Sequence, residues 1–281
     1  MLRMFKRGFW ICILFLMIMP GPSLAFDTTT REFKSFATDL KAHFEKIGWN
    51  DLRPEQIDWV YYRKSPLKRP LVFATFGQGA NDITIFLGGV HGDESPSVYM
   101  MFKLAEFLKA NPELYRNKTI VIAPIVNPDG FFKKPQLRTN ARGVDINRNF
   151  PTRDWRPGKK DRYYPGPRAS SENETKFQVA LINRYKPNKI ISVHSPLGFY
   201  DYDGPSSDLD SIVVWLKKIS KDNGLPFRRY KLYPGSLGNY AGVERKIHTL
   251  TLELPSSSPQ QGALYFDQFK KTLLEVMEQD F

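Results

Sequence analysis

The stretch Ile83–Glu94, ITIFLGGVHGDE, joins a predicted strand to a predicted helix through a glycine-rich turn. Residues 83–87 are apolar and mostly β-branched or aromatic, which is typical of a buried strand. Helical spacing begins at Ser95, so His91 follows the strand and Glu94 falls where the helix should start. The glycines allow the backbone to turn closely enough for both side chains to leave the same rim of a sheet.

Strand and helix patterns alternate along the rest of the chain. This alternation predicts an α/β fold with a largely parallel sheet and helices on both faces. Residues 127–168 lack periodicity, and a loop of that length in a compact domain is usually functional. The further strand-like runs are 57–62, 71–76, 119–125, 189–193 and 247–252, and the helical patterns are 30–47, 95–110, 170–185, 208–223 and 263–279.

The first 25 residues have the form of a targeting segment. Basic residues precede the apolar run 8–19, and Ser23-Leu24-Ala25 has the small-x-small form found before cleavage sites. The apolar run is too short for a spanning helix, which favours a signal peptide over an uncleaved anchor. We therefore expect a periplasmic or secreted protein with no stable membrane anchor after cleavage. Its parts are a signal peptide at 1–25, an N-terminal helical extension at 26–65 and a catalytic domain at 66–281.

Charge and cysteine content restrict the partners. The formal net charge is +12, and removing the three basic residues of the first 25 leaves +9. Such a charge attracts nucleic acid, anionic surfaces or acidic peptides. The basic residues are dispersed and no nucleic-acid motif is present, so we expect no nucleic-acid partner, whereas acidic substrates remain open. Cys12, the only cysteine, lies in the targeting segment, which leaves the mature chain without disulfides.

A metal site is predicted where strands end. His194 closes the strand 189–193, and the carboxyl ends of strands in open α/β sheets line the ligand crevice. Together with His91 and Glu94 it would give two histidines and one glutamate with an open fourth position, as in catalytic zinc sites. Asp93 could replace Glu94, but we expect it to cap the helix or accept a hydrogen bond. Asp145 could orient a ligating histidine.

Glu253 lies in the apolar run 249–255, TLTLELP, which should be a buried strand. An unpartnered carboxylate is costly there, and it is typically kept as a general base with a shifted pKa. The remaining histidines have simpler interpretations. We expect His43 to lie on the surface of the first helix and His248 to be structural.

Several motifs follow one another along the chain. They are His91-x-x-Glu94, the run 127–130 (NPDG), the run 138–151 (RTNARGVDINRNFP), His194, the run 234–238 (PGSLG) and Glu253. In this order they resemble the zinc metallocarboxypeptidases, and the resemblance covers roughly residues 70 to 275. Within that family the chain is most similar to the murein tripeptide amidases, which cut the bond between γ-D-glutamate and diaminopimelate. The resemblance implies a mixed, mostly parallel twisted sheet of about eight strands in one domain.

Carried over by motif, the resemblance implies one Zn²⁺ per chain, held by His91, Glu94 and His194. Glu253 would act as the general base on a metal-activated water, and Arg138 would stabilise the developing oxyanion. Arg142 has no family role, and we expect it to form a surface salt bridge.

The substrate side of the site follows from the same resemblance. Asn147 and Arg148 match the pair that grips the free carboxylate of the substrate. Tyr230 and Tyr233 are both candidates for the family's mobile hydrogen-bonding tyrosine, with a buried strand tyrosine as the alternative. Leu237 supplies no carboxylate for a basic terminal residue, so polar recognition of diaminopimelate would have to come from elsewhere, such as the loop 201–210.

The sequence therefore predicts an exported zinc amidase or carboxypeptidase that hydrolyses murein peptides at the γ-D-glutamyl-diaminopimelate bond. One alternative is a general metallocarboxypeptidase that trims ordinary peptides, and another is a cell-wall-binding module without catalysis. Deacylases of small acylated amino acids share some motifs, but the export signal argues against them. A cis peptide bond is expected at Ser195-Pro196, and no feature indicates a particular oligomeric state.

Overall fold

The computed structural model describes residues 31–205, 209–229 and 231–280. The predicted signal peptide at 1–25 and the candidate Tyr230 lie outside the described residues. No helix in the described part is both long and apolar enough to span a membrane.

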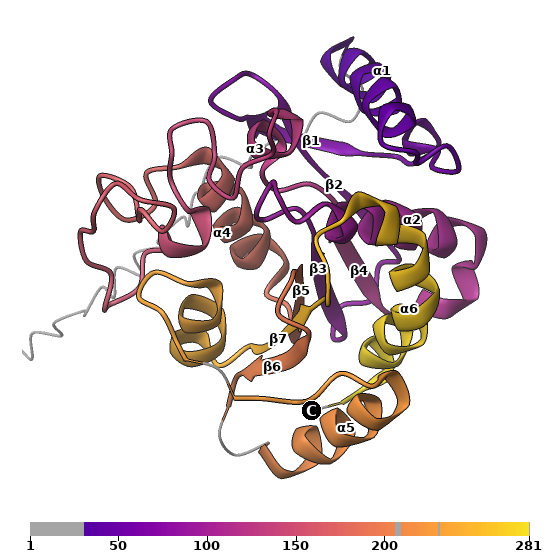
Figure 1. Cartoon of the computed structure of the whole chain (residues 1–281). Helices are drawn as coiled ribbons and strands as arrows, with labels where there is room; N and C mark the ends of the chain where they lie inside the picture. The colour runs from indigo at the N-terminus through magenta and orange to yellow at the C-terminus, as the bar shows by residue number, and fades with distance from the viewer. Residues whose placement is uncertain (1–30, 206–208, 230, 281) are drawn as a thin grey trace, which may run out of the picture.

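A seven-stranded mixed sheet forms the centre of the α/β fold, in the order β1-β2-β4-β3-β5-β7-β6 (Figure 1). The four strands β4, β3, β5 and β7 run parallel, while β1, β2 and β6 are antiparallel to their neighbours. We expected about eight strands, one more than the described residues contain. The strands are β1 (Val60–Lys64), β2 (Pro70–Phe76), β3 (Ile83–Leu87), β4 (Thr119–Ala123), β5 (Lys189–His194), β6 (Phe199–Asp203) and β7 (His248–Glu253).

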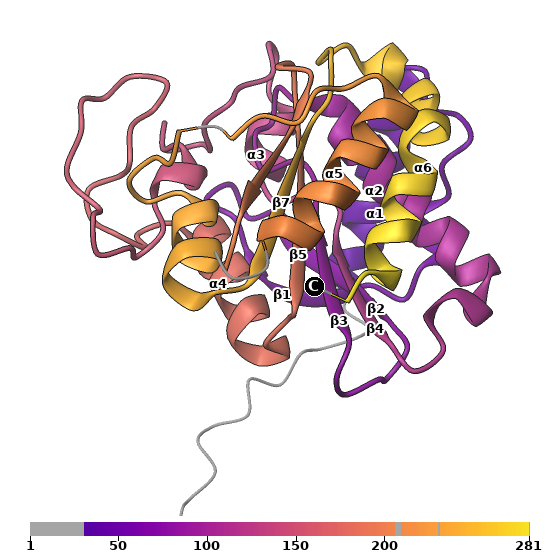
Figure 2. The same cartoon turned by 90° about the horizontal axis from the view of Figure 1, so that it is seen from below.

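Helices cover both faces of this sheet, as Figures 1 and 2 show. The helices α1 (Arg31–Lys46), α2 (Ser95–Ala110), α5 (Leu209–Asn223) and α6 (Gly262–Glu278) share one apolar core with one face. The other face packs against α4 (Asn173–Tyr185) and the π-helical segment η5 (Gly238–Val243). Because both faces are covered, every residue of β4 and β5 is buried. The short helical segments are α3 (Pro128–Phe132), η1 (Pro54–Gln56), η2 (Pro112–Tyr115), η3 (Ile146–Arg148) and η6 (Pro259–Gln261).

The N-terminal helix belongs to the main core. Leu40 and Phe44 are almost fully buried, and the ring of Phe44 lies 5.2 Å from that of Trp49. Trp49 in turn donates a hydrogen bond from Nε1 to the Pro259 carbonyl at 2.8 Å. No break in packing separates residues 31–65 from the rest, so the domain boundary at 65 stays a prediction. The expectation that His43 lies on the surface is wrong, because its ring is half-buried, 4.8 Å from that of Phe131.

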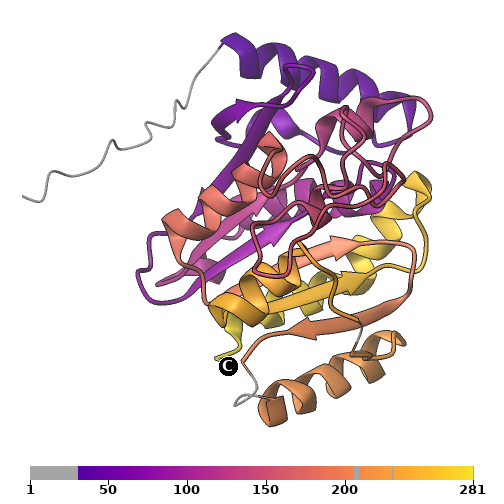
Figure 3. The ribbon, with the colours of Figure 1, turned by 90° about the vertical axis from the view of Figure 1, so that its left-hand side faces the viewer.

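The long connection between β4 and α4 lies over the same face as α4, which Figure 3 turns toward the viewer. It has little regular structure, as its sequence predicted, but it is anchored from within. Asn149, fully buried, donates from Nδ2 to the Pro165 carbonyl at 2.7 Å and the Arg168 carbonyl at 2.9 Å. Its Oδ1 accepts from the Glu172 backbone N–H at 3.0 Å. One side chain thus holds both ends of the loop 150–172.

Candidate active site

The sheet brings the predicted site residues to one edge. β3, β5 and β7 are parallel neighbours, so their carboxyl ends lie together. His194 and Glu253 are paired directly in the β5–β7 register and point to the same side of the sheet. His91 follows β3 by a short turn, and Glu94 immediately precedes α2. Four positions that are distant in sequence therefore converge.

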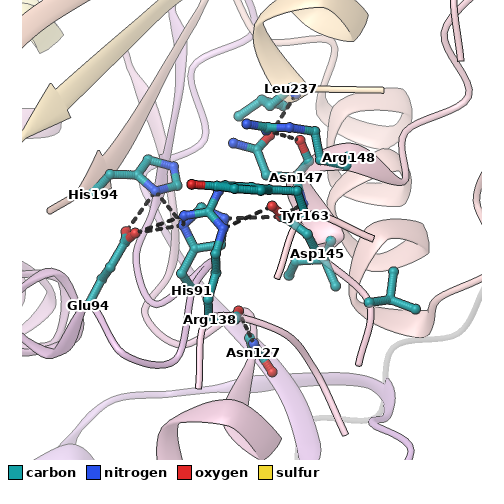
Figure 4. Close-up of polar contacts among 12 residues, drawn as sticks. His91, Glu94, Asn127, Arg138, Asp145, Asn147, Arg148, Tyr163, His194 and Leu237 are labelled. Atoms are coloured by element: carbon teal, nitrogen blue, oxygen red, sulfur yellow. Dashed lines mark hydrogen bonds and ion pairs between the residues drawn. The ribbon is translucent and has the colours of Figure 1, made fainter. Parts of the chain in front are cut away.

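The three predicted metal ligands form one buried group. The ligand atoms of His91, Glu94 and His194 all lie within 4.8 Å of one another. One carboxylate oxygen of Glu94 is 2.7 Å from His91 Nδ1, and the other is 2.8 Å from His194 Nδ1. The two Nδ1 atoms are 3.1 Å apart, so both imidazoles face the same small volume (Figure 4).

The surroundings of the two rings fit a zinc ion at that volume. His91 Nε2 contacts Asp145 Oδ1 at 3.2 Å, and His194 Nε2 contacts Ser192 Oγ at 2.9 Å. Both Nε2 atoms therefore have oxygen partners, which orient the rings and leave Nδ1 free to ligate. The Arg138 guanidinium also lies 3.2 Å from His91 Nδ1, so it is close to the ligand atoms. Two imidazoles and a carboxylate are a catalytic zinc donor set.

The carboxylates around this group are kept ionised. Burial opposes the charge on Glu94, but His91 and His194 together hold its pKa below the usual value. Asp145 is fully buried, and His91 and Arg138 likewise hold its pKa low against the effect of burial. Anionic Glu94 is the form that can ligate a metal, and anionic Asp145 is the form that accepts a hydrogen bond from His91 Nε2–H.

Glu253 differs from these carboxylates. Its Oε2 is buried without a hydrogen-bond partner in the described chain, and it faces the same cavity as the ligand group. Burial raises its pKa, an effect that the nearby histidines only partly offset. A carboxyl group with a raised pKa and one oxygen without a partner is well suited to accept a proton from a bound molecule.

Arg138 is held in place at both ends. Its Nε donates to Asp145 Oδ2 at 2.9 Å, and its Nη1 lies 3.5 Å from Glu94. The carbonyl of Arg138 accepts from Asn127 Nδ2 at 3.1 Å, and Asn127 Oδ1 also accepts from the Gly130 backbone N–H. The NPDG turn therefore fixes the arginine beside the ligand group.

Asn147 and Arg148 line the same cavity as Arg138. Asn147 Oδ1 accepts from the Leu237 backbone N–H at 2.8 Å, which ties the 138–151 segment to the segment before η5. The Arg148 guanidinium donates to the Asn147 carbonyl at 2.7 Å and stacks 4.2 Å from the centre of the Tyr233 ring. Tyr233 thus lines the cavity beside Arg148.

The cavity has a volume of about 550 Å³ and contains further polar groups that the sequence did not single out. Tyr163 comes from the long loop and lies between Arg138 and Arg148, with its ring centre 5.2 and 6.0 Å from their guanidinium carbons (Figure 4). Lys231 also lines the wall. No motif marks Tyr163, because its position depends on the course of an irregular loop.

Two aspartates on β6 also face the cavity. Asp201 and Asp203 are two residues apart on the strand and so share one face. Burial, with the charge of Asp201, raises the pKa of Asp203 to about 7, although Arg229 opposes the shift. Asp203 packs against Gly238, where a Cβ would come within 2.0 Å of its Oδ2. Both residues fall in the 201–210 segment in which polar recognition was expected.

Other expectations about single residues have mixed outcomes. Asp93 does not cap α2, since no side-chain bond caps that helix and Asp93 Oδ1 has no hydrogen-bond partner within the described residues. Arg142 forms the expected surface contact, 3.8 Å from Glu172. His248 pairs with the Tyr202 hydroxyl at 2.8 Å, which fits a structural role. The Ser195-Pro196 bond is cis, as predicted, and Lys134-Pro135 is cis as well.

Comparison with known proteins agrees with this geometry. Residues 50–223 match the family model described as zinc carboxypeptidase. Murein peptide amidase A of Escherichia coli (strain K12) is 31% identical over 217 residues, which cover 72% of this chain and 84% of that protein. Murein peptide amidase A of Vibrio campbellii is 30% identical over 233 residues, covering 78% of this chain and 87% of the relative.

A comparison with solved structures points to the same family. The crystal structure of murein-tripeptide amidase MpaA from Escherichia coli O157 superposes with a TM-score of 0.62 at 28% identity, covering 79% of this chain and 92% of that one. The matched family model supplies the expectation of zinc, and the His-Glu-His group supplies a suitable set of ligands. The chain therefore belongs to the zinc carboxypeptidase family and is a metallo-hydrolase.

Proposed function

We propose that this chain is an exported zinc-dependent amidase that hydrolyses murein peptides at the bond between γ-D-glutamate and diaminopimelate. The observation that carries the proposal is the composition of the cavity. It combines a metal-ligand group, a buried glutamate with one oxygen that has no partner in the described chain, an Asn-Arg pair and two aspartates in one space of about 550 Å³. The murein peptide amidases among the relatives support the substrate class, and the basic, apolar segment at 1–25 supports export.

The catalytic roles follow from the placement of each side chain. Zinc, when bound by His91, Glu94 and His194, supplies a Lewis acid for the scissile carbonyl and lowers the pKa of water. Glu253 accepts a proton from the attacking water and donates it to the leaving amine. Arg138, fixed by Asp145, stabilises the negative charge that develops on the carbonyl oxygen.

Two further residues of the cavity would fix the position of the substrate relative to the metal site. Arg148 and Asn147 would bind the free carboxylate next to the scissile amide, because a guanidinium can form two parallel hydrogen bonds with it. Tyr233, which stacks on Arg148, would limit the positions that this guanidinium can take.

The two aspartates favour a leaving residue that has a second amino group. Diaminopimelate carries an ammonium and a carboxylate at its far end, where lysine carries only an ammonium. Asp201 and Asp203 would bind that ammonium, and Lys231, which lines the same cavity, would bind the distal carboxylate. The two aspartates would thus supply the negative charge for the terminal side chain, because Leu237 has no carboxylate.

An assay of the mature chain with the tripeptide L-Ala-γ-D-Glu-meso-diaminopimelate tests this proposal. Release of free diaminopimelate is expected, at a higher kcat/KM than release of lysine from the matched lysine peptide. No diaminopimelate, with ordinary peptides trimmed at their C-termini instead, would identify a general carboxypeptidase. Retention of the protein on murein with no hydrolysis of any peptide would identify a wall-binding module.

A further inference from the structure

A second cavity of about 560 Å³ adjoins the active-site cavity. Asp93, Arg138 and Arg162 line both, so the two spaces meet beside the metal-ligand group. Asn147 and Arg148, which would hold the leaving residue, line only the active-site cavity. The second cavity therefore extends toward the acyl side of a bound substrate.

Cations outnumber anions around this second cavity. Its walls contain Arg138, Arg142, Lys160 and Arg162, against the carboxylates of Asp93 and Asp161. Arg138 is already paired with Asp145, and Arg142 lies 3.8 Å from Glu172. In the described part of the chain, neither Lys160 nor Arg162 forms an ion pair, so their charge is available to a ligand.

The segment that carries these cations is tied to the metal-ligand group. The backbone N–H of Asp145 donates to the Tyr164 carbonyl at 2.8 Å, and Tyr164 N–H donates to the Asp161 carbonyl at 3.1 Å. Asp161 also accepts from the Tyr163 N–H through its side chain at 2.7 Å. Because Asp145 itself contacts His91, the turn 161–164 keeps a defined position relative to the scissile bond.

We propose that this second cavity binds an anionic group on the acyl side of the scissile bond. The inference rests on the proposed function, for which that group is the α-carboxylate of the γ-D-glutamyl residue. The γ-linkage leaves this carboxylate free, separated from the scissile carbonyl by the methylene chain of the glutamyl group. Lys160 and Arg162 bind the carboxylate. Asp93, whose Oδ1 is buried without a partner, accepts a hydrogen bond from the N–H on the same carbon.

The test compares two substrates that differ only in this group. One is L-Ala-γ-D-Glu-meso-diaminopimelate, and the other has the α-carboxylate replaced by a carboxamide. We expect wild type to show a kcat/KM about 10-fold higher for the carboxylate, and we expect that preference to shrink at high salt. Equal kcat/KM values for the two substrates would overturn the proposal.

Reversing the charge of a lysine in the cavity wall tests whether the cavity causes the preference for the carboxylate substrate. Lys160→Glu should lower the ratio of kcat/KM for the carboxylate substrate to kcat/KM for the carboxamide substrate about 5-fold. Lys159→Glu, which makes the same change at an exposed neighbour that does not line the cavity, should leave the preference intact. Equal effects of the two variants would contradict a role for the cavity. Zinc content and the thermal transition show that both variants are folded.

A second pair of substrates separates this inference from the proposed function. If wild type cuts ordinary α-linked peptides and not the γ-linked tripeptide, the proposed function fails. Peptides with glutamate or glutamine before the terminal residue then report on the cavity. A glutamate preference that Lys160→Glu removes would support an anion site in a general carboxypeptidase, and no preference would reject the site.

Discussion

Buried carboxylates with different partners define the chemistry of the site at the scale of single residues. Glu94 and Asp145 are surrounded by histidines and Arg138 and stay ionised. For Glu253 and Asp203 the nearby cations do not outweigh burial, and burial raises the pKa of each. Glu94 and Asp145 are therefore suited to bind a metal or to orient one of its ligands. Glu253 and Asp203 are suited to exchange a proton or to bind a cationic group of the substrate.

Glu253→Gln should abolish hydrolysis without loss of zinc. Glutamine has nearly the same shape but cannot accept the proton of the attacking water, so kcat should fall by about 10²- to 10⁴-fold. The measurement is the initial rate of amine release, with zinc content as the control. A variant that keeps more than a tenth of the wild-type rate would remove Glu253 from the mechanism.

Asp203→Asn should stabilise the protein at high pH and weaken substrate binding. The pKa of Asp203 is raised to about 7 in the folded chain from 3.8, so its protonated form is favoured by folding and this contribution is lost as pH rises from about 4 to 7. Asparagine does not ionise, so the variant should unfold at a higher temperature than wild type at pH 8 and at a similar temperature at pH 4.

The same variant should raise KM for a leaving residue with a second amino group, because the carboxylate that binds the ammonium is lost. A peptide ending in alanine serves as the control and should be cut equally well by both proteins. Identical pH dependence of unfolding in the two proteins would show that Asp203 does not titrate as described.

His91, His194 and Glu253 were predictable as site residues because each follows or ends an apolar run that the sequence marks as a strand, and parallel strands bring such positions together. Glu94 was predictable because it lies three residues after His91, where the next helix begins. Tyr163 was not predictable, because the irregular loop that carries it is positioned by contacts of Asn149 and Asp145 that no local pattern reveals.

At the scale of elements, the long loop depends on a few buried polar side chains rather than on repeated backbone bonding. Asn149 binds the Pro165 and Arg168 carbonyls and the Glu172 N–H at once. Loss of this side chain would leave buried backbone groups without partners, and each such group is costly. Arg148 and the loop residue Tyr163 depend on this anchoring.

Asn149→Ala should therefore destabilise the protein by about 2–4 kcal/mol and lower kcat/KM as well. Urea unfolding followed by tryptophan fluorescence measures the first effect. Asn183→Ala, at an exposed position of α4, is the control and should stay within about 0.5 kcal/mol of wild type. A loop that behaves independently of the fold would leave the unfolding midpoint of Asn149→Ala unchanged.

The boundaries of the helices and central strands were close to prediction because their apolar patterns are regular. The helix at 95–110 was predicted with the bounds of α2. β6 was missed because its sequence, FYDYD, alternates the core-facing Tyr200 and Tyr202 with aspartates that face the cavity, so no continuous apolar run marks it. β6, whose sequence least resembles that of a buried strand, thus carries two candidate residues for substrate specificity.

At the scale of the whole molecule, one core joins the N-terminal helix to the sheet. Leu40 of α1 is fully buried in the cluster that contains α2, α5 and α6. An N-terminal segment packed in this way is part of the folded unit, whatever processing occurs before residue 31.

Leu40→Ala should accordingly cost about 2–5 kcal/mol of unfolding free energy, because it opens a cavity in the core. Leu264→Ala makes the same change at a side chain that is 58% exposed, and it should cost less than about 0.5 kcal/mol. Equal stability of the two variants would show that α1 is dispensable, as a removable propeptide would be.

The most direct measurement is the metal content of the purified protein by elemental analysis, for wild type and for His194→Ala, together with activity before and after chelation. We predict one zinc per wild-type chain, loss of both zinc and hydrolysis in His194→Ala, and recovery of chelated wild type on addition of zinc. A wild-type chain that hydrolyses its substrate without bound metal, or a His194→Ala variant that retains zinc, would contradict the account.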